Sequence, residues 1–289
     1  MRGLALIVAN PVAGSSSERK LRTARALLEE AGYGVEVLLT SKGGDAEALA
    51  RGAAARGPAF VMAAGGDGTF NEVANGLAGG GAAMALLPMG TSNVLAKELG
   101  VPEDPEGAVR AALSGRPRSV CLGRISMAGG DRYFCLMAGV GFDGLVVARA
   151  LRLARRPGKL AHIAAGLLAL PGWRPGPIEV VADGRAWEGR SAIVCNAAKY
   201  AGHFRIAPDA RMADPTLRVV LMRGGGRLDM ARYVLSALAG RLTGLGDVAY
   251  FEAREVEVRG EAHVQTDGDY RGLAPASISV AAGALKIIY

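Results

Sequence analysis

A glycine-rich segment that carries one carboxylate, Gly65-Gly66-Asp67-Gly68-Thr69, is the first place in this sequence where chemistry could occur. It joins an apolar run to a stretch with helical spacing, and its glycines leave backbone N–H groups open to an approaching phosphate. Asp67 is unexpected there, because a carboxylate repels phosphate unless it serves a metal ion or takes a proton. The segment therefore favours Mg-nucleotide chemistry. A tight turn in which Asp67 caps the following helix explains the same residues.

Two more loops of this kind follow other apolar runs. Pro88-Met89-Gly90-Thr91-Ser92-Asn93 offers a hydroxyl at Thr91 and an amide at Asn93, and Asn10-Pro11-Val12-Ala13-Gly14 ends the first apolar run. Helix capping is again the competing interpretation. Because three such loops are harder to dismiss than one, we expect them to face one crevice that binds a nucleotide.

A second candidate for chemistry is Thr266-Asp267-Gly268-Asp269-Tyr270. Extended backbone would turn Asp267 and Asp269 to the same side, and paired carboxylates could orient or deprotonate an attacking hydroxyl. The alternative is an Asp-Gly hairpin turn, which we also expect at Asp183-Gly184.

Several other motifs are excluded by their spacing. Residues 139–144 match GxGxxG, but no acidic residue follows at the distance that a dinucleotide site needs, and the Walker A pattern GxxxxGK[ST] is absent. The histidines are too scattered for a triad or a zinc site. Cys121, Cys135 and Cys195 fit neither a disulfide framework nor a CxxC metal site, which indicates a reducing cytosol.

The pattern of strands and helices expected to position these residues changes near residue 118. Before it, buried strands alternate with helices: strands at 4–9, 35–40, 59–64 and 84–87, and helices at 18–31, 45–56, 69–77 and 92–99. Repeated β-loop-α units imply a doubly wound parallel sheet with ligands at the carboxyl ends of its strands. The later short β-rich runs indicate an antiparallel sandwich or barrel. We therefore expect an α/β domain at 1–118 and an antiparallel β domain at 119–289.

Residues 145–170 interrupt the β pattern with helical spacing and a basic character. The basic residues are Arg149, Arg152, Arg155, Arg156 and Lys159. A solvated basic helix face and a surface that approaches anionic lipid both explain them. The apolar part of the segment is too short to cross a bilayer.

The charge balance of the whole chain favours anionic partners. Lys and Arg number 34 against 27 Asp and Glu, which gives a formal charge of +7. Only 5% of the residues are aromatic, and no basic run is interleaved with aromatics of the kind that stacks bases. We therefore expect no nucleic-acid partner.

Taken together, these residues resemble the diacylglycerol kinase catalytic-domain family, which includes bacterial lipid kinases and the sphingosine and ceramide kinases. The match consists of Asn10-Pro11 with Gly14, Thr40 before Gly44-Asp45-Ala46, Gly65-Gly66-Asp67-Gly68-Thr69-Phe70-Asn71-Glu72, Pro88 with Gly90-Thr91-Ser92-Asn93, Gly141-Phe142-Asp143, Asn196 with Tyr200 and Gly202, Ala207-Pro208-Asp209-Ala210, and Asp267-Gly268-Asp269. The glycine-aspartate loop is shared with NAD kinases, whereas the ordered set is specific.

The resemblance implies an ATP-binding α/β domain followed by a β-sandwich domain, an active site in the cleft between them, and C-terminal residues from about 278 to 289 that return to the first domain. The positions that it assigns to ATP are Asn10, Thr40, Gly65, Gly66, Asp67, Gly68, Thr69, Phe70, Asn71 and Thr91. Asp67 would act through Mg²⁺ or directly on the reacting groups. Asp269 stands where similar bacterial lipid kinases carry the proton-accepting glutamate of an Asp-Gly-Glu motif.

Two departures from the family pattern affect the reacting groups. Asp269 is one methylene shorter than that glutamate, so it could act directly or through a bridging water, or Asp67 could be the base instead. Val94 follows Asn93 where many relatives carry an aspartate, which removes a partner from the metal network.

A structural Mg²⁺ site of some bacterial members corresponds to Asp214 with the backbone carbonyls of Arg211 and Thr216. Here Asp214-Pro215 replaces the more usual Asp-Gly.

The resemblance thus predicts an ATP-dependent lipid kinase that transfers the γ-phosphate to a lipid hydroxyl, diacylglycerol-like or sphingoid- and ceramide-like. The expected partners are ATP, Mg²⁺ and a lipid substrate at a membrane surface. We expect a cytoplasmic protein, with peripheral binding to the inner face of the membrane as a further option. The alternatives are a soluble-substrate kinase of the NAD kinase type, which would carry a second Asn-Glu pair that this sequence lacks, and a catalytically inactive lipid- or nucleotide-binding module.

Overall fold

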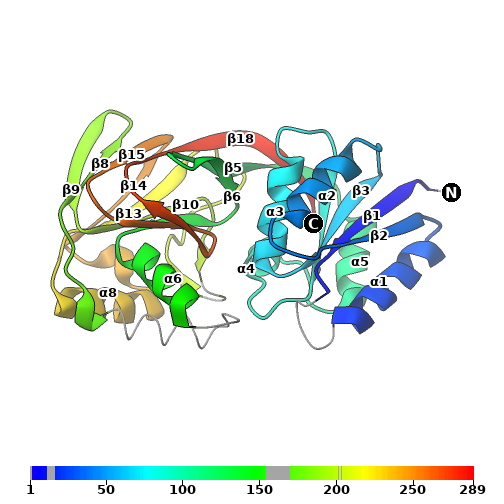
Figure 1. Cartoon of the computed structure of the whole chain (residues 1–289), viewed down its shortest axis with the longest axis horizontal. Coiled ribbons are helices and arrows are strands. Elements are labelled where there is room, and N and C mark those ends of the chain that lie inside the picture. The colour runs from blue at the N-terminus through cyan, green and yellow to red at the C-terminus, as the bar shows by residue number, and fades with distance from the viewer. Residues whose placement is uncertain (1, 12–16, 154–169, 201, 203) are drawn as a thin grey trace. The chain divides into compact units, whose positions relative to one another are not determined.

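A computed structural model of the protein describes residues 2–11, 17–153, 170–200, 202 and 204–289 (Figure 1). The chain divides into two compact units. Unit 1 comprises Met1–Cys121 and Gly283–Tyr289, and unit 2 comprises Leu122–Ala282. Among the described helices, none is long and apolar enough to cross a membrane.

Unit 1 is built on a parallel sheet with the strand order β2-β1-β3-β4. Its strands are β1 (Leu4–Ala9), β2 (Gly34–Leu39), β3 (Phe60–Gly65) and β4 (Ala83–Pro88). Every residue of β3 and β4 is buried, as expected for strands covered on both faces. The last residues of β18 (Ala276–Ile288) extend the sheet by pairing in parallel with β4.

Helices cover both faces of this sheet. They are α1 (Ser17–Glu30), α2 (Asp45–Ala54), α3 (Asp67–Leu77), α4 (Val94–Leu99) and α5 (Pro105–Ser114). α2 packs on α3, and α1 packs on α5 against the other face (Figure 1). A Cβ at Gly76 of α3 would lie 2.4 Å from the carbonyl oxygen of Glu47, so glycine permits the close approach of α2. The predicted doubly wound α/β arrangement is confirmed.

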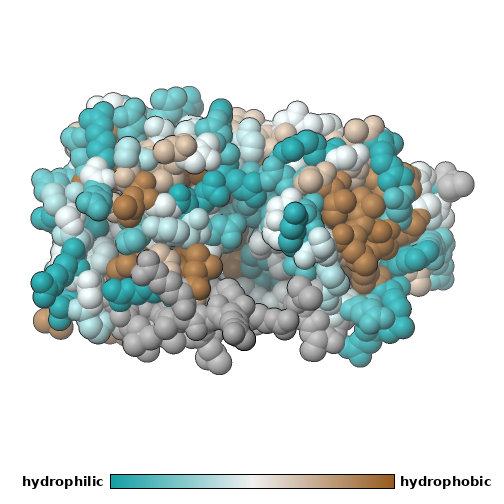
Figure 2. All heavy atoms as spheres, viewed as in Figure 1, coloured by the Kyte–Doolittle hydropathy of each residue, from teal (hydrophilic) through white to brown (hydrophobic). Residues whose placement is uncertain are grey.

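The edge strand β2 is the least covered part of this sheet. Its first five residues are half-buried, and Leu39 is 58% exposed. Figure 2 shows a hydrophobic area around β2 and hydrophilic residues over α1 on the face in view. Both follow from the sequence, since α1 is largely charged and the strands are apolar.

The strand order creates a topological switch point between β1 and β3. The chain leaves β1 toward β2 on one side and returns on the other side through β3 and β4. The ends of the strands are level, because Ala9 pairs with Leu39 and Ala64, and Gly65 pairs with Pro88. Loops after the strands therefore meet at the edge where doubly wound sheets bind ligands.

Unit 2 contains two antiparallel layers, as the β-rich runs predict. One is a six-stranded sheet with the order β14-β13-β10-β7-β16-β17. Its strands are β7 (Met137–Val140), β10 (Ser191–Cys195), β13 (Leu217–Met222), β14 (Val248–Ala253), β16 (His263–Thr266) and β17 (Asp269–Leu273). The other contains β5 (Pro117–Met127), β6 (Gly130–Phe134), β8 (Ile178–Ala182), β9 (Arg185–Gly189), β15 (Glu255–Arg259) and the first part of β18.

Inward-facing residues of both layers form one hydrophobic core. Val140, Val194 and Val264 come from the six-stranded sheet, and Val180 and Val256 come from the other layer. The antiparallel β-sandwich is therefore confirmed. A short pair, β11 (Lys199–Tyr200) with β12 (Phe204–Arg205), and two 3-10 turns, Leu170–Gly172 and Leu242–Gly244, complete the described β and turn structure.

Among the described residues of unit 2, α6 (Phe142–Leu153) and α8 (Arg227–Leu238) accompany the sandwich. α6 is the described beginning of the predicted basic helical segment. Residues 154–169 of that segment, with three of its five basic residues, lie outside the described residues. α8 was not predicted, because the β-rich runs that the sequence shows in this half leave residues 227–238 without an assigned element. Its buried face is narrow, since Met230 and Tyr233 are buried while Leu228, Leu235 and Leu238 are exposed.

The predicted hairpin at Asp183-Gly184 is confirmed. Both residues have positive φ, 46° and 82°, and Ala182 pairs with Arg185 across the turn. The Asp183 carboxylate also accepts hydrogen bonds from the backbone N–H groups of Arg254 at 3.1 Å and Glu255 at 2.9 Å. One side chain therefore ties the β8–β9 turn to the start of β15.

Replacing Asp183 by alanine should lower the free energy of unfolding by about 1–2 kcal/mol, because two backbone donors lose their acceptor and alanine adopts positive φ at a cost. Urea unfolding followed by circular dichroism measures the loss. Asp183→Gly is the matched control, since it removes the same acceptor without the conformational cost and should lose less. An alanine variant as stable as the native chain would contradict this role.

Candidate functional site

The glycine loop between β3 and α3 lies at the switch-point edge of the unit 1 sheet. β3 ends at Gly65, and α3 begins at Asp67. A Cβ at Gly65 would lie 2.4 Å from the hydroxyl oxygen of Thr69, so this glycine is required by the packing of the turn itself. Thr69 is buried, with 7% of its surface exposed. The loop therefore exposes mainly backbone atoms.

The loop after β4 lies directly against this glycine loop. The carbonyl of Gly65 accepts hydrogen bonds from the N–H groups of Met89 at 2.8 Å and Gly90 at 3.2 Å. A Cβ at Gly90 would lie 2.6 Å from the Cα of Gly66. The two loops therefore form one continuous backbone surface, as their sequences predict.

Gly68 differs from these glycines because nothing inside the fold requires it. It is exposed in the first turn of α3 and has no positive φ, and no described atom lies within 4 Å of the place that a Cβ would take. Glycine costs a helix about 1 kcal/mol relative to alanine. A ligand that approaches the backbone closely would explain why position 68 is glycine.

Asn93 braces the second loop and does not face a ligand, which corrects the expected amide contact. It is fully buried and has a φ of 47°. Its Oδ1 accepts from the N–H of Gly90 at 3.0 Å, and its Nδ2 donates to the carbonyl of Gly90 at 2.9 Å. Thr91, at the tip of the same loop, is exposed.

Asp67 caps a helix, although it is not the helix that the sequence suggested. Its Oδ1 accepts a hydrogen bond at 3.0 Å from the N–H of Leu95, in the first turn of α4. Burial raises the pKa of Asp67 above its ordinary value, and the α4 amides with the charge of Lys97 offset only part of this effect. The site thus holds a partly buried carboxylate whose pKa is raised by burial.

Two lysines hold the loop after β4, and sequence reasoning missed both. Lys97 donates to the carbonyl of Ser92 at 2.6 Å and forms an ion pair with Glu103 at 2.9 Å. Lys20 of α1 donates to the carbonyls of Pro88 at 3.0 Å and Glu103 at 2.7 Å. No local pattern could identify the contact of Lys20 with Pro88, since the two residues are 68 positions apart.

Asn10 and Thr40 lie one residue beyond β1 and β2 on the same edge. The N–H of Asn10 donates to the carbonyl of Ala64, and the N–H of Thr40 donates to the carbonyl of Ala9, both at 2.9 Å. These bonds continue the ladders of the sheet. Asn10 therefore lies beside the start of the glycine loop, and Thr40 lies one strand further along the same edge.

Other residues of the glycine-aspartate signature are buried or bonded within unit 1 and stabilise the fold. Phe70 is fully buried and its N–H donates to the carbonyl of Gly66, so a direct contact of this side chain with ATP is withdrawn. Asn71 is also buried, and its Oδ1 accepts from Asn75 at 3.1 Å. The Glu72 carboxylate accepts from two amides at the start of α2, at 3.0 and 3.1 Å.

In unit 2, Asp267 and Asp269 do not form a carboxylate pair. Asp267 and Gly268, with φ of 48° and 92°, are the two central residues of a hairpin turn between β16 and β17. The Asp267 carboxylate accepts from the three consecutive N–H groups of residues 135–137, at 2.6, 2.9 and 2.9 Å. Asp269 is exposed at the start of β17. The hairpin interpretation is therefore confirmed, and only Asp269 is presented outward.

Positive charge lies close to Asp269. Burial and repulsion by Arg132 lower the pKa of Arg271, whereas the charge of Asp269 acts in the opposite direction. Arg271 is the extra residue at an irregularity of the β16–β17 pairing, and it lies close enough to Asp269 and Arg132 for both charges to affect its pKa.

The rejected GxGxxG run has an internal explanation. A Cβ at Gly139 would lie 1.8 Å from Asp143 Oδ2, and one at Gly144 would lie 2.3 Å from the carbonyl oxygen of His263. These glycines make room for neighbours within unit 2.

The structural Mg²⁺ site expected at Asp214, with the backbone carbonyls of Arg211 and Thr216, stays a prediction. The carbonyl of Arg211 accepts from the N–H of Asp214 at 3.0 Å, and the guanidinium of Arg218 donates to the hydroxyl of Thr216 at 3.2 Å. Among the described residues, no group of three or more His, Cys, Asp or Glu side chains could hold a metal ion.

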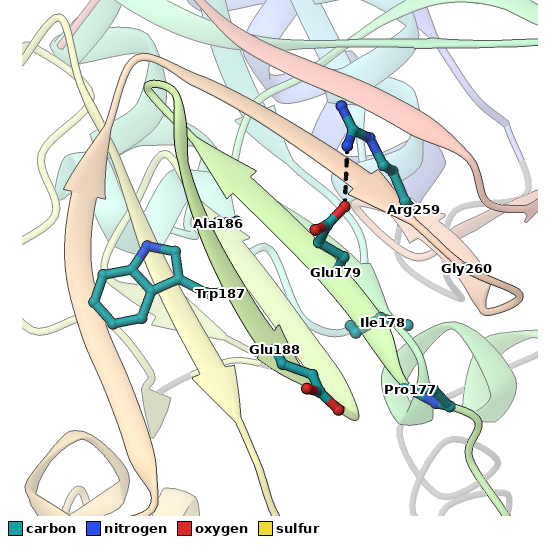
Figure 3. Close-up of a pocket in the computed structure, with 8 residues that line it drawn as sticks. All are labelled: Pro177, Ile178, Glu179, Ala186, Trp187, Glu188, Arg259 and Gly260. Atoms are coloured by element: carbon teal, nitrogen blue, oxygen red, sulfur yellow. Dashed lines mark hydrogen bonds and ion pairs between the residues drawn. The ribbon is translucent and has the colours of Figure 1, made fainter.

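A surface pocket of about 500 Å³ on unit 2 contains none of the predicted site residues (Figure 3). Its ion pair joins Arg259 to Glu179 at 3.0 Å. The residues that line it are Pro177, Ile178, Glu179, Ala186, Trp187, Glu188, Arg259 and Gly260. The glycine loops and the Asp269 turn remain the candidates for chemistry.

Comparison with known proteins identifies relatives along the whole chain. Residues 4–125 match the diacylglycerol kinase catalytic domain, and residues 137–289 match the YegS C-terminal NAD kinase beta sandwich-like domain. A diacylglycerol kinase of Bacillus subtilis is 31% identical over 94% of this chain and 91% of its own length. One of Mycobacterium tuberculosis H37Rv is 30% identical over 99% and 95%.

The fold agrees with a solved structure as well. A Bacillus anthracis Sterne protein superposes with a TM-score of 0.79 at 23% identity, over 99% of this chain and 96% of that one. The two matched domains correspond to the unit with the glycine loops and the unit with the Asp267–Asp269 turn. The chain therefore belongs to the diacylglycerol kinase catalytic-domain family.

Proposed function

We propose that this chain is an ATP-dependent lipid kinase that transfers the γ-phosphate to the hydroxyl of a diacylglycerol-like lipid. The observation that carries the proposal is the presentation of Asp67, a partly buried carboxylate with a raised pKa, beside the exposed Gly68 at the switch point of the sheet. A site that only bound anions would gain nothing from this carboxylate. The acceptor is inferred from the names of the curated relatives.

The nucleotide phosphates would bind along the joined backbone surface of the two loops. The start of α3 supplies N–H groups and a favourable field for negative charge. Thr91 is exposed at the tip of the second loop, and Asn10 and Thr40 follow the neighbouring strands. We propose these residues, with Gly65 to Thr69, as the ATP-binding set.

Asp67 fits a magnesium ion that arrives with the nucleotide. Mg²⁺ in kinases is commonly held by one or two carboxylates together with substrate phosphates, so a single carboxylate is sufficient. The ion would neutralise the charge that spreads over the transferring phosphoryl group. Asp67 would hold it with a carboxylate whose orientation is fixed by its hydrogen bond to Leu95.

The proton of the lipid hydroxyl is assigned to one of two carboxylates. Asp269 is exposed and stands on a fixed hairpin turn. Asp67 has the raised pKa that general-base catalysis favours. Two alternatives use the same residues: phosphorylation of a soluble acceptor such as NAD, and ligand binding without transfer.

An acceptor panel separates these functions. Full-length protein would be incubated with radiolabelled ATP, Mg²⁺ and diacylglycerol, monoacylglycerol, ceramide, a sphingoid base or NAD, and the products separated. We expect label in the diacylglycerol product. Label only in NAD would establish the soluble-substrate alternative, and binding of ATP without any labelled product would establish the inactive module.

Substitution of the two carboxylates tests their roles in transfer. Asp67→Ala should abolish turnover, and Asp269→Asn should lower kcat by about 100-fold or more, as loss of a general base does, with a smaller change in KM. Asp131→Asn is the control, because that exposed carboxylate pairs with Arg124 and is hydrogen-bonded to Ser126, and neither is a proposed site residue. Normal kcat in both site variants would contradict the mechanism.

Gly68→Ala should separate nucleotide binding from stability. Alanine should stabilise the first turn of α3 by about 0.5–1 kcal/mol, because nothing in the fold occupies its side-chain position. It should also raise the KM for ATP by about tenfold, since the backbone would lose its close contact with phosphate.

Gly52→Ala is the matched control for this variant. Gly52 is also an exposed helical glycine with open space around it, within α2. Its replacement should stabilise the protein without changing the KM for ATP. A Gly68→Ala variant with native KM would show that phosphate does not approach there.

The pH profile reports the ionisation of Asp67. Lys97 lowers the pKa of Asp67, so Lys97→Met should raise that pKa further. Because the ionised carboxylate is the active form, activity falls as pH drops through this pKa, and the acid limb of kcat/KM should move to higher pH. Glu103→Gln removes the ion pair and keeps the lysine charge, so its limb should not move upward. An unmoved limb in Lys97→Met would exclude Asp67 as the group that titrates.

A further inference from the structure

A chain of hydrogen bonds in unit 2 leads from a buried carboxylate to the turn that presents Asp269. Tyr200 donates its hydroxyl to Asp143 Oδ1. Gln265 donates from Nε2 to Asp143 Oδ2 at 2.5 Å, and its Oε1 accepts from the N–H of Gly268 at 2.7 Å. Gly268 directly precedes Asp269.

The partners fix the orientation of the Gln265 amide. A carboxylate that already accepts from Tyr200 presents acceptors to Gln265, and the N–H of Gly268 is only a donor. The amide NH₂ must therefore face Asp143, and the amide oxygen must face the turn. Glutamate would lose the donor, and an apolar side chain of similar volume would lose both bonds.

The position is buried and closely fitted. Gln265 is 2% exposed and Asp143 is 7% exposed. A Cβ at Gly139 would lie 1.8 Å from Asp143 Oδ2 and 2.8 Å from Gln265 Nε2, so glycine leaves space for both groups. Gly139 pairs with Gln265 in the ladder of β7 with β16. Burial, and then the negative charge of Asp143, raise the pKa of Tyr200, which keeps its hydroxyl protonated as a donor.

The turn is held from a second direction by Asp267. Its carboxylate binds the three N–H groups of residues 135–137, and its own N–H donates to the carbonyl of Met137 at 3.0 Å. These bonds offset the cost of a non-glycine residue with a φ of 48°. Asp267 thus fixes the first central residue of the turn, and Gln265 fixes the second.

We infer that Gln265, oriented by Asp143 and Tyr200, is a positioning residue that holds the Asp267-Gly268 turn and thereby aims Asp269. The inference rests on the proposed function, in which Asp269 acts on the lipid hydroxyl. If the network only stabilised the core, substitutions of Gln265 and Asp269 would affect kcat independently of each other. A positioning role requires that coupling.

The test compares Gln265→Met and Gln265→Glu with Tyr200→Phe, all in the full-length chain. Cys195→Ala is the control, because this fully buried thiol lies near Asp143 and no described hydrogen bond links it to the chain of bonds. Hydrogen exchange of the peptides that span β16 and β17 is measured without substrate. kcat and the KM for ATP are then measured for each variant, and Gln265→Met is combined with Asp269→Asn.

In Gln265→Met and Gln265→Glu, the amide hydrogens of the turn should exchange faster than in the native chain. Both variants should lower kcat by about tenfold or more, while the KM for ATP stays within about twofold of native. Tyr200→Phe should do the same to a smaller extent, and Cys195→Ala should resemble the native chain. The double variant should be no slower than Asp269→Asn alone, because residues that act as one unit are not additive.

Native exchange at the turn in Gln265→Met would overturn the inference. Independent, multiplicative losses in the double variant would overturn it as well, since they would separate Gln265 from Asp269. Failure of the proposed function has a different signature: the native chain would label no lipid, or Asp269→Asn would keep native kcat, whatever the exchange at the turn.

Discussion

The close approach of two backbones at Gly66 and Gly90 is the constraint on which the nucleotide side of this protein depends. A side chain at Gly90 would collide with Gly66 at 2.6 Å, so the ends of β3 and β4 meet only because both loops carry glycine. This contact brings Asp67, at the start of α3, within hydrogen-bonding distance of the first turn of α4. The same contact therefore shapes the surface proposed to bind phosphate and orients the carboxylate beside it.

Carboxylates of the family signature have separate physical tasks here. Glu72 and Asp267 are occupied by backbone N–H groups and hold elements together. Asp67 combines both tasks, since it caps α4 and lies at the ligand edge of the sheet with a raised pKa. Asp269 alone among these four is exposed. Burial and amide contacts thus separate groups that hold the fold from groups that could react.

The sequence was sufficient to predict those features that depend on residues close together in the chain. Period-two and helical spacing located the parallel sheet, and Asp-Gly steps located both hairpin turns, because these features depend on neighbouring residues. It was insufficient where a side chain acts at long range. Asp267 binds amides about 130 positions away, and Lys20 reaches a carbonyl 68 positions away. The brace at Asn93 was missed because helix capping and ligand contact explained its position equally well. The helix α8 was missed because its buried face is narrow and its apolar residues are mostly exposed.

The short side chain of Asp269 gives the long-range contacts around its turn a specific meaning. A glutamate, as carried by similar bacterial lipid kinases, can adjust its carboxylate by an additional rotatable bond, whereas an aspartate follows its backbone more closely. The position of the Asp269 carboxylate therefore depends strongly on how rigidly the turn before it is held. Asp267 and Gln265 hold that turn from two directions with bonds of 2.6–2.9 Å. Rigid support of this kind is what Asp269 would require in its proposed role, because its carboxylate has limited reach.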